Sequence, residues 1–389
     1  MSQPRILFLV SEDWYFWSHR AHVARAAQAA GYEVLVATRV SSCGERIEAA
    51  GFRLLPITVS RGAGNPFREL GTLRELVRLY RQHKPDIVHH VAVKNIFLGT
   101  LAARLARVPA VVNAFAGLGH LFTADGLKTR VMRGVLRTIL RWTLNVPRMR
   151  VIVQNAEDGD ELVQARIVRP EQVLLIRGAG VCTTAFAPQA PAAGPPVVLL
   201  AARMLWSKGV GQFVEAARRL RARGHNARFV LTGRVDEANP NHVPRAQLLQ
   251  WRQENDVEWW DHQDDMPQVL ATASIVCLPT FYGEGLPRVL LEAAACAKPL
   301  VTTDMRGCHD ICRDGVNGFL IPPRDVDALT GSLEKLLVNP DLQRQLGDAG
   351  RAMVLREFSD DQVVNQTLGI YQSLLNDGGE AEVLLSRAA

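Results

Sequence analysis

The stretch PQAPAAGPP, residues 188–196, divides this sequence in two. It carries no charged side chain and shows no helical or strand periodicity, and prolines with small residues are typical of linkers. The whole chain has 389 residues, which is longer than a single α/β core usually becomes. The sequence therefore predicts two domains, over residues 1–187 and 197–359, joined by this linker.

Apolar runs of strand length alternate with amphipathic helical stretches on both sides of the linker. The runs before it are Ile6–Val10, Val34–Thr38, Leu54–Val59, Ile87–Val91, Ala110–Asn113 and Val151–Gln154, and those after it are Val197–Ala201, Ala227–Thr232, Val257–Trp260, Ile275–Pro279, Leu300–Thr303 and Phe319–Ile321. Strands that are apolar on both faces indicate parallel sheets covered by helices. The sequence thus predicts an α/β fold with two Rossmann-like, doubly wound domains that bind ligands at the carboxyl ends of their strands. A last helix, at about residues 360–376, is expected to pack back on the N-terminal domain.

Composition narrows the class of protein only broadly. The net charge is +6 and the pI is near 9.2, which suits an anionic partner such as a nucleotide, a phospholipid surface or a nucleic acid. Binding of nucleic acid is not expected, because the basic residues gather in one stretch instead of converging with aromatic residues on a surface. The six cysteines form no CxxC pair, so no metal site is expected. Neither a signal peptide nor a membrane-spanning helix is predicted.

The segment PTFYGEGLPRVLLEAAACAKPLV, residues 279–301, has the pattern of a ligand-binding junction. A strand ends at its start, a loop with two glycines follows, and the proline after Leu286 suits the first position of a helix. The N–H groups of Gly285 and Leu286 would then point out of the helix start, where phosphate is favoured. Glu284 precedes this helix and Glu292 lies within it, so both carboxylates are expected to face one ligand. The alternative is an ordinary helix cap.

A second segment, ARMLWSKGV at residues 202–210, closes the first strand of the C-terminal half and opens its first helix. Arg203 and Lys208 lie in the loop between these elements, so both cations are expected to reach the anion that the 279–301 segment binds. Two cations suit a diphosphate leaving group, because they stabilise the negative charge that grows as its bond breaks. The alternative is two solvated surface cations.

These two segments resemble motifs of the retaining GT-B glycosyltransferases of family 4. Glu284 and Glu292 match the E-x7-E motif, Arg203 and Lys208 match the R-x4-K donor-phosphate motif, and GCHDICRDGVNGFLIPPRD at residues 307–325 also has the family's form. The resemblance implies two Rossmann-like domains that face each other across a cleft. It extends over nearly the whole chain.

The same resemblance implies roles for individual residues on the donor side. Glu284 would hold the donor sugar as a catalytic residue, Glu292 would bind the nucleotide ribose, and the amides of Gly285 and Leu286 would face the sugar and phosphate. The loop at Gly233–Arg234 is expected to contribute to recognition of the base and sugar.

A histidine that supports the sugar in other family members lies near the position of His120, which follows a Gly-Leu-Gly turn. The resemblance implies a catalytic role for His120. A loop histidine that serves only packing is the alternative, because the local string differs from that of other members.

The segment SEDWYFWSHRAHV, residues 11–23, has bulky aromatic residues where many family members have a glycine-rich loop. It resembles the subgroup that adds sugars to polyprenyl-diphosphate-linked intermediates in capsule, O-antigen and N-glycan assembly, as do PDIVHHVAVKN (85–95), AFAGLGHLF (114–122) and LIRGAGV (175–181). The acceptor-side residues implied by this placement are Ser18, His19, Arg20, Lys94 and Asn95. Arg20 or Lys94 would pair with the lipid diphosphate; a solvated helix start is the alternative.

The stretch GLKTRVMRGVLRTILRWTLNVPRMR, residues 126–150, contains seven basic residues and no acidic one. Steps of three and four place four of its arginines on one helical face: Arg130, Arg133, Arg137 and Arg141. A basic amphipathic helix of this kind is typical of binding to an anionic membrane surface. The alternative is a solvated face over a core helix.

These features together predict a glycosyltransferase that moves a hexose or N-acetylhexosamine, with retention, from a nucleotide sugar to a polyprenyl-diphosphate-linked saccharide. UDP is the expected nucleotide, and the cytoplasmic face of the inner membrane is the expected location. No cofactor or metal is expected, because members of the family generally work without one and Asp264–Asp265 have the pattern of helix caps. A sugar-nucleotide epimerase and a soluble glucan-extending transferase remain as alternatives.

Overall fold

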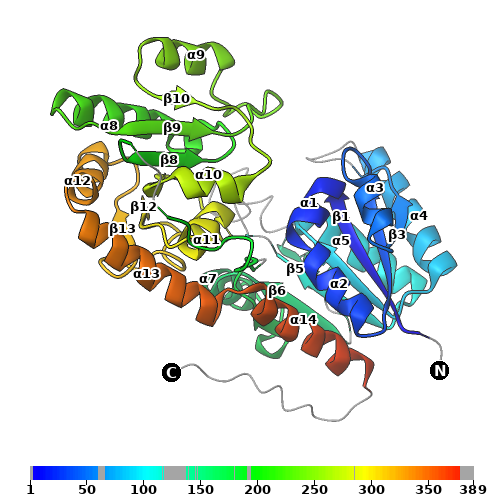
Figure 1. Cartoon of the computed structure of the whole chain (residues 1–389). Helices are drawn as coiled ribbons and strands as arrows, with labels where there is room; N and C mark the ends of the chain where they lie inside the picture. Colours follow the sequence, from blue (N-terminus) through cyan, green and yellow to red (C-terminus); the bar gives the residue numbers. More distant parts are fainter. Residues whose placement is uncertain are drawn as a thin grey trace. The chain divides into compact units, whose positions relative to one another are not determined.

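The computed structural model describes residues 3–59, 66–115, 117, 137–138, 140–144, 146, 148–178, 180–190, 194–283 and 285–376. The chain forms two compact units, and most of their helices and strands are labelled in Figure 1. The first unit comprises Met1–Ala179 together with Asp361–Ala389, and the second comprises Gly180–Asp360. Both are α/β, as the sequence predicts.

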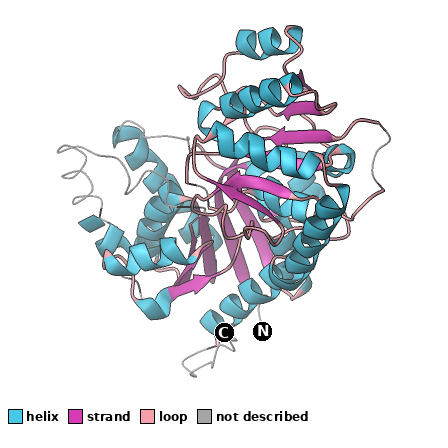
Figure 2. Cartoon of the chain, turned by 90° about the vertical axis from the view of Figure 1, so that its left-hand side faces the viewer, coloured by secondary structure: helices cyan, strands magenta, loops and turns pink. Residues whose placement is uncertain are grey.

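The first unit is built on a seven-stranded sheet with the order β3-β2-β1-β4-β5-β6-β7, in which all neighbours are parallel. Its strands are β1 Arg5–Glu12, β2 Glu33–Arg39, β3 Arg53–Pro56, β4 Ile87–Val91, β5 Ala110–Ala114, β6 Met149–Val153 and β7 Val173–Leu175. The helices described in it are α1 Asp13–His19, α2 Ala21–Ala29, α3 Gly44–Ala49, α4 Pro66–His83, α5 Val93–Ala106, α7 Ala156–Gln164 and the short η2 Pro170–Gln172, and they are joined by α14 Asp360–Leu375 from the end of the chain. Helices flank the strands in Figure 2.

Strand β1 shows why continuous apolar runs in the sequence predict the strands. Ile6 and Phe8 enter one buried core, and Leu7 and Leu9 enter the other, on the opposite face of the sheet. A strand that is covered on both faces has no solvent side on which polar residues would alternate.

The last helix, α14 (Asp360–Leu375), packs into the core of the first unit. Its Tyr371 is fully buried, and the hydroxyl lies 2.6 Å from Nδ1 of His89 in β4. Val363, Ile370 and Leu374 join the same apolar cluster. After the last residue of the second unit, the chain therefore returns to the first unit, and α14 contributes side chains to its core.

The second unit is built on a six-stranded parallel sheet with the order β10-β9-β8-β11-β12-β13. Its strands are β8 Val197–Ala201, β9 Arg228–Thr232, β10 Glu258–Trp259, β11 Ile275–Leu278, β12 Leu300–Thr303 and β13 Gly318–Ile321. Its helices are η3 Trp206–Lys208, α8 Val210–Ala222, α9 Arg245–Gln253, α10 Met266–Thr272, α11 Arg288–Ala295, α12 Val326–Leu337 and α13 Pro340–Glu357.

Residues 180–187 belong to the second unit, although the sequence analysis assigned them to the first domain. The guanidinium of Arg351 on α13 donates to the carbonyl oxygens of Thr183 and Phe186, at 2.9 and 3.0 Å, and to that of Ala295. The N–H of Val181 also donates to the carbonyl of Phe358 at 3.1 Å. Because of these long-range contacts, which local sequence does not reveal, the boundary lies at residue 179, closer to the N-terminus than the predicted residue 187.

The segment between β1 and β2 contains two short helices. It forms α1 and then α2, with Arg20 between them. The carboxylate of Asp13, at the start of α1, is buried and accepts from the N–H groups of Ser41, Ser42 and Cys43 at 2.7–2.8 Å. It also accepts from the Ser41 hydroxyl at 2.6 Å. Asp13 therefore fixes α1 against the loop that follows β2.

We expect the replacement Asp13→Asn to destabilise the first unit by about 2 kcal/mol at pH 7. Burial alone would raise the pKa of Asp13, but the hydrogen bonds from Ser41, Cys43 and Ser42 outweigh it and lower the pKa to about 2. A depressed carboxyl pKa stabilises the fold above the unfolded-state value near 4 and loses this effect as the pH falls toward 2. Urea unfolding at several pH values measures the difference.

The exposed Asp160 on α7 provides a matched control, since Asp160→Asn removes the same charge from the same unit. The gap in stability between Asp13→Asn and the natural chain should close between about pH 4 and pH 2. A gap that stays constant with pH, or an equal loss in the Asp160 variant, would contradict the role assigned to this carboxylate.

Candidate active site

The candidate donor site of the second unit lies at the carboxyl ends of β8 and β11. The strand order reverses at this point, because β9 and β10 extend from one side of β8 and β11 begins the other side. Ligands bind at such switch points in parallel sheets, since the loops leave the two strands in opposite directions and open a crevice. The loop after β8 carries Arg203 and Lys208, and the loop after β11 carries Gly285 and Leu286.

The loop that carries Lys208 is held directly against the end of β11. The carbonyl of Ser207 accepts from the N–H of Phe281 and from the hydroxyl of Thr280, both at 3.0 Å. Gly209 follows with φ +76, and a Cβ at this position would lie 2.1 Å from the carbonyl oxygen of Pro279. Only glycine permits this approach, so the sequence places the base of the Lys208 side chain beside the 279–283 segment.

Arg203 is oriented by the neighbouring loop, which follows β9. Its guanidinium donates to the carboxylate of Asp236 at 3.0 Å, and its side chain is 55% exposed. Gly233, in the loop after β9, packs closely against the loop after β8, because a Cβ at Gly233 would lie 1.7 Å from the carbonyl oxygen of Ala202. The carbonyl of Arg234 accepts from the N–H of Met204 at 3.0 Å. An exposed ion pair is weak, so a diphosphate can replace Asp236 as the partner of Arg203.

Glu292 lies in α11 and is only 6% exposed. Its Oε1 accepts from Nε of Arg288, one turn earlier, at 2.5 Å. Burial raises the pKa of Glu292, and the positive charge and hydrogen bond of Arg288 oppose that rise. A buried carboxylate is the type of group that can recognise ribose hydroxyls, which are neutral hydrogen-bond donors.

The start of α11 differs from the prediction. The helix begins at Arg288 and Pro287 is its N-cap, so the proline does not occupy the first helical position. Gly285 and Leu286 therefore precede the helix, and their N–H groups belong to the loop. The proline shifts the boundary because the loop keeps Pro287 in an extended conformation, with ψ at 111°. Glu284 lies outside the described residues.

Two threonines that the sequence analysis did not single out hold this region together. Thr303 at the end of β12 donates its hydroxyl to the carbonyl of Thr280, and Thr302 donates to the carbonyl of Leu278 at 2.7 Å. Both threonines are fully buried. β-branched residues in a strand are ordinary, so no local signal marks them as supports of a loop one strand away.

The predicted acceptor-side residues also lie at a switch point, between β1 and β4 of the first unit. Asn95 in the first turn of α5 is 1% exposed, and its Nδ2 donates to the Ser11 hydroxyl at 3.0 Å and to the Val91 carbonyl at 2.8 Å. Its Oδ1 has no hydrogen-bond partner among the described residues. Ala92 just before α5 has φ 73 and ψ 149, a conformation that is costly for any residue with a Cβ. Strain and an unsatisfied buried acceptor are both typical of functional sites.

Arg20 is 5% exposed, and within the described ranges no atom accepts a hydrogen bond from its Nε. Burial, and to a smaller extent the positive charge of Arg20, holds the pKa of His89 well below the usual value. His89 is therefore neutral, and its Nδ1 lies beside the hydroxyl of Tyr371. A buried guanidinium to which the described part of the chain offers no carboxylate is costly, which suits a position that an anionic ligand completes.

The remaining acceptor-side predictions have local partners. The Ser18 hydroxyl lies 2.9 Å from the Trp14 carbonyl and 2.6 Å from Nδ1 of His19, whose ring stacks on Tyr15 at 4.1 Å. Lys94 forms an ion pair with Glu69 at 2.7 Å, so it is not a solvated cation. Ser18 and His19 lie in the last turn of α1, so the alternative of a solvated helix start does not apply to them.

Part of the predicted membrane-binding face falls beyond the described residues, as do Arg130, Arg133 and His120. Arg137 donates from Nε to the carbonyl of Ala165 at 2.6 Å, and Arg141 is exposed. Within the described ranges no helix has the length and apolar content of a membrane span. The same residues contain no cluster of three metal-ligating side chains. Asp265 accepts from the N–H of Gln268 at 3.2 Å and caps α10, as expected.

Comparison with known proteins identifies the class. The family model described as Glycosyl transferase 4-like matches residues 5–155, and the model described as Glycosyl transferases group 1 matches residues 183–353. With two parallel-sheet units of the GT-B type and these two matches, the chain belongs to the GT-B glycosyltransferases of the family 4 type. It is an enzyme that transfers a sugar.

Individual relatives show how wide this family is. The N,N'-diacetylbacillosaminyl-diphospho-undecaprenol alpha-1,3-N-acetylgalactosaminyltransferase of Campylobacter jejuni is 24% identical, over 96% of this chain and 100% of that protein. The glycogen synthase of Mycobacterium tuberculosis is 25% identical, over 91% and 89%. A crystal structure of Anabaena HepE in complex with UDP and glucose matches with a TM-score of 0.77 and 19% identity, over 95% of this chain and 100% of that chain. The last likeness shows the fold alone.

Proposed function

We propose that the chain transfers a hexose or N-acetylhexosamine, with retention of configuration, from a UDP-sugar to a polyprenyl-diphosphate-linked saccharide. One observation carries the donor side of this proposal: the Lys208 loop is bonded to the 279–283 segment at the switch point of the second sheet. This contact supports a position for the Lys208 side chain beside the loop that leads to Glu292. The name of the Campylobacter jejuni relative supports the lipid-linked acceptor, and the UDP in the Anabaena structure supports the nucleotide.

In the proposed reaction, Arg203 and Lys208 bind the diphosphate and stabilise the charge that it gains as the glycosidic bond breaks. Glu292 accepts hydrogen bonds from the ribose, and Glu284 holds the donor sugar with the amides of Gly285 and Leu286. The acceptor hydroxyl attacks from the face that the diphosphate leaves, and a phosphate oxygen takes its proton. The protein therefore contributes position and electrostatic stabilisation, and no residue needs to form a covalent intermediate.

On the acceptor side, Arg20 is the residue that we propose for the lipid diphosphate. It is a buried cation of the β1–β4 switch point, and it lies near enough to His89 to lower the pKa of that histidine. The unsatisfied Oδ1 of Asn95 would accept a hydroxyl of the saccharide. We assign supporting positions to Ser18, His19 and Lys94. We also propose that His120 has a catalytic role in addition to that of Glu284.

A soluble glucan-extending transferase is the second candidate, because the Mycobacterium tuberculosis relative is a glycogen synthase. The two candidates share the donor chemistry and differ in the acceptor. A buried cation to which the described residues offer no carboxylate favours the lipid-linked acceptor, since a glucan is uncharged.

The experiment is a screen of UDP-, GDP- and ADP-sugars against a short-chain polyprenyl-diphosphate saccharide, against glycogen and without acceptor. We expect turnover of a UDP-sugar with the lipid-linked acceptor and little with glycogen. Turnover with glycogen alone would identify the glucan-extending enzyme, and conversion of the donor without acceptor would identify an epimerase. Either result would overturn the proposal.

A further inference from the structure

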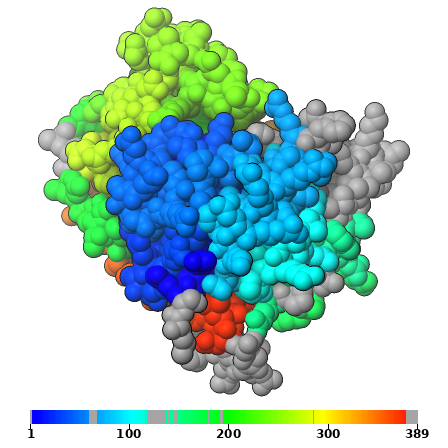
Figure 3. Space-filling view, turned by 90° about the vertical axis from the view of Figure 1, so that its right-hand side faces the viewer, coloured from blue at the N-terminus to red at the C-terminus, as the bar shows by residue number. Residues whose placement is uncertain are grey.

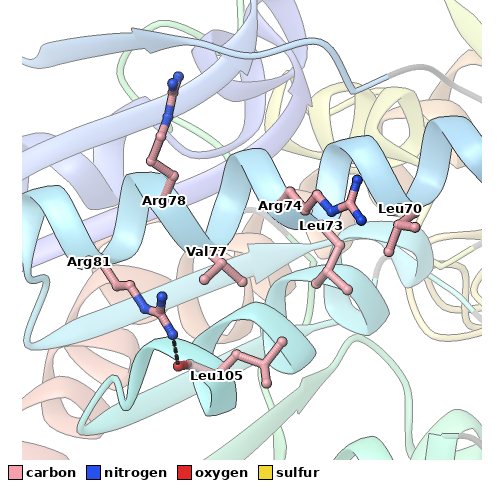
Figure 4. A pocket seen from close by; sticks show the side chains of 7 residues that line it. All are labelled: Leu70, Leu73, Arg74, Val77, Arg78, Arg81 and Leu105. Atoms are coloured by element: carbon pink, nitrogen blue, oxygen red, sulfur yellow. Dashed lines mark hydrogen bonds between the residues drawn. The ribbon is translucent and has the colours of Figure 1, made fainter.

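The first unit carries a groove of about 460 Å³ between α4 and α5, outside the donor and acceptor residues. Its apolar lining consists of Leu70, Leu73, Val77 and Leu105. Figure 4 shows Leu73 and Val77 pointing from α4 toward the helix that carries Leu105, and Arg81 reaching the Leu105 carbonyl. That hydrogen bond, from Nη2 at 3.1 Å, joins the two helices along one side of the groove.

Apolar side chains along this groove are exposed. Leu70 is 44% exposed and Leu105 is 50% exposed. Arg104, next to Leu105, donates to the carbonyl of Trp142 at 2.6 Å and lies over its ring at 4.5 Å. Trp142 is itself 59% exposed, so the apolar surface continues past the end of α5. Figure 3 shows the exposed face of the first unit to which α4 and α5 contribute.

The charge around this surface has one sign. Arg74, Arg78 and Arg81 line the groove, and no acidic residue does. The acidic residues of α4 are engaged elsewhere, because Glu69 pairs with Lys94 and Glu75 accepts from the Thr58 hydroxyl at 2.6 Å. Exposed leucines and a tryptophan bordered by arginines match the layers of a bilayer surface, where anionic headgroups lie above acyl chains.

We propose that this α4–α5 face, defined by Leu70, Arg74, Arg78, Leu105 and Trp142, docks on an anionic phospholipid bilayer. The inference deepens the proposed function, since a lipid-linked acceptor lies in a membrane, but its physical test does not depend on turnover. A second basic surface is thereby added to the arginines of residues 130–141. Charge complementarity and exposed apolar area both contribute to the proposed binding. They reside in different side chains, so each can be removed by a separate variant.

The experiment measures sedimentation of the full chain with vesicles of phosphatidylglycerol and phosphatidylcholine, and with vesicles of phosphatidylcholine alone. We compare Leu70→Glu/Leu105→Glu with Arg74→Gln/Arg78→Gln, which keeps the apolar surface. Val338→Glu/Leu355→Glu is the control, because these residues are 64% and 49% exposed on the second unit. Arg81 is left unchanged, since it holds α5. Thermal unfolding of each variant verifies the fold.

We expect binding to require phosphatidylglycerol, to fall roughly thirtyfold in the arginine variant and to fall by roughly tenfold or more in the leucine variant. The control variant should bind as the natural chain does. Unchanged vesicle binding in both groove variants would overturn the proposal. It would also be overturned if the groove variants lost self-association in light scattering but the natural chain bound no vesicles, because a second copy would then cover the face. Both groove variants should still transfer sugar to a soluble short-chain acceptor. If the proposed function is wrong, the natural chain itself will not catalyse this transfer.

Discussion

Replacement of Lys208 by alanine is expected to lower kcat by roughly 10²- to 10³-fold, the largest effect of any single substitution in the second unit. The amine acts on charge that develops only as the diphosphate leaves, so most of its contribution appears in the transition state. Initial rates with a saturating sugar nucleotide measure the loss. Lys208→Arg should recover part of the rate, because the charge remains while the geometry of the donor changes.

Lys335→Ala is the control for Lys208→Ala. Lys335 is an exposed lysine on α12 of the same unit, where it lies over the ring of Phe319 at 5.2 Å. Its removal changes the net charge equally but should leave kcat unchanged. If the two variants were equally active, the cation at residue 208 would have no part in the reaction.

Glu292→Gln is expected to raise the dissociation constant of the nucleoside diphosphate by roughly 10- to 100-fold, because a charged acceptor of the ribose hydroxyls becomes neutral. The fold should not suffer, since burial raises the pKa of Glu292 and its charge is therefore costly to the empty protein at neutral pH. Calorimetric titration gives the affinity and thermal unfolding gives the stability of the same sample.

The pH dependence of binding separates this role from a structural one. Because the pKa of Glu292 is raised, its carboxylate becomes protonated as the pH falls toward that pKa. The affinity for the nucleoside diphosphate should therefore fall with acidification in the natural chain, and less so in Glu292→Gln. Glu334→Gln is the control, because Glu334 also pairs with an arginine, Arg223 at 2.7 Å, but lies on the surface of α12. A lower melting temperature with unchanged affinity in Glu292→Gln would show that the carboxylate supports the fold instead.

Most strands of both sheets were predictable from sequence because they are buried on both faces. The run Leu300–Thr303 coincides with β12, and most others differ from the observed strands by a residue or two. The short β7 escaped prediction, since three residues carry no periodicity. The domain boundary was misplaced for another reason: Arg351 binds the 183–186 segment from 165 residues away or more, and no local pattern reports such a contact.

The candidate site divides in the same way. Residue type and spacing singled out Lys208, Arg203 and Glu292, because their chemistry suits a nucleoside diphosphate. The contacts that hold them were not predictable, as with the Ser207 carbonyl that joins two loops from different strands. Sequence also gave no sign that Arg20 and Asn95 are buried, since both lie in segments that resemble solvated helix starts.

The central claim is that the Lys208 loop and the helix of Glu292 hold one nucleoside diphosphate at the carboxyl edge of the second sheet. Calorimetric titration of the full chain with UDP, GDP and ADP, and with the corresponding nucleosides, tests it most directly. Lys208→Ala should weaken the preferred diphosphate and spare its nucleoside, while Glu292→Gln should weaken both. Equal affinity of all three proteins for every diphosphate, or no binding of any diphosphate by the natural chain, would contradict the claim.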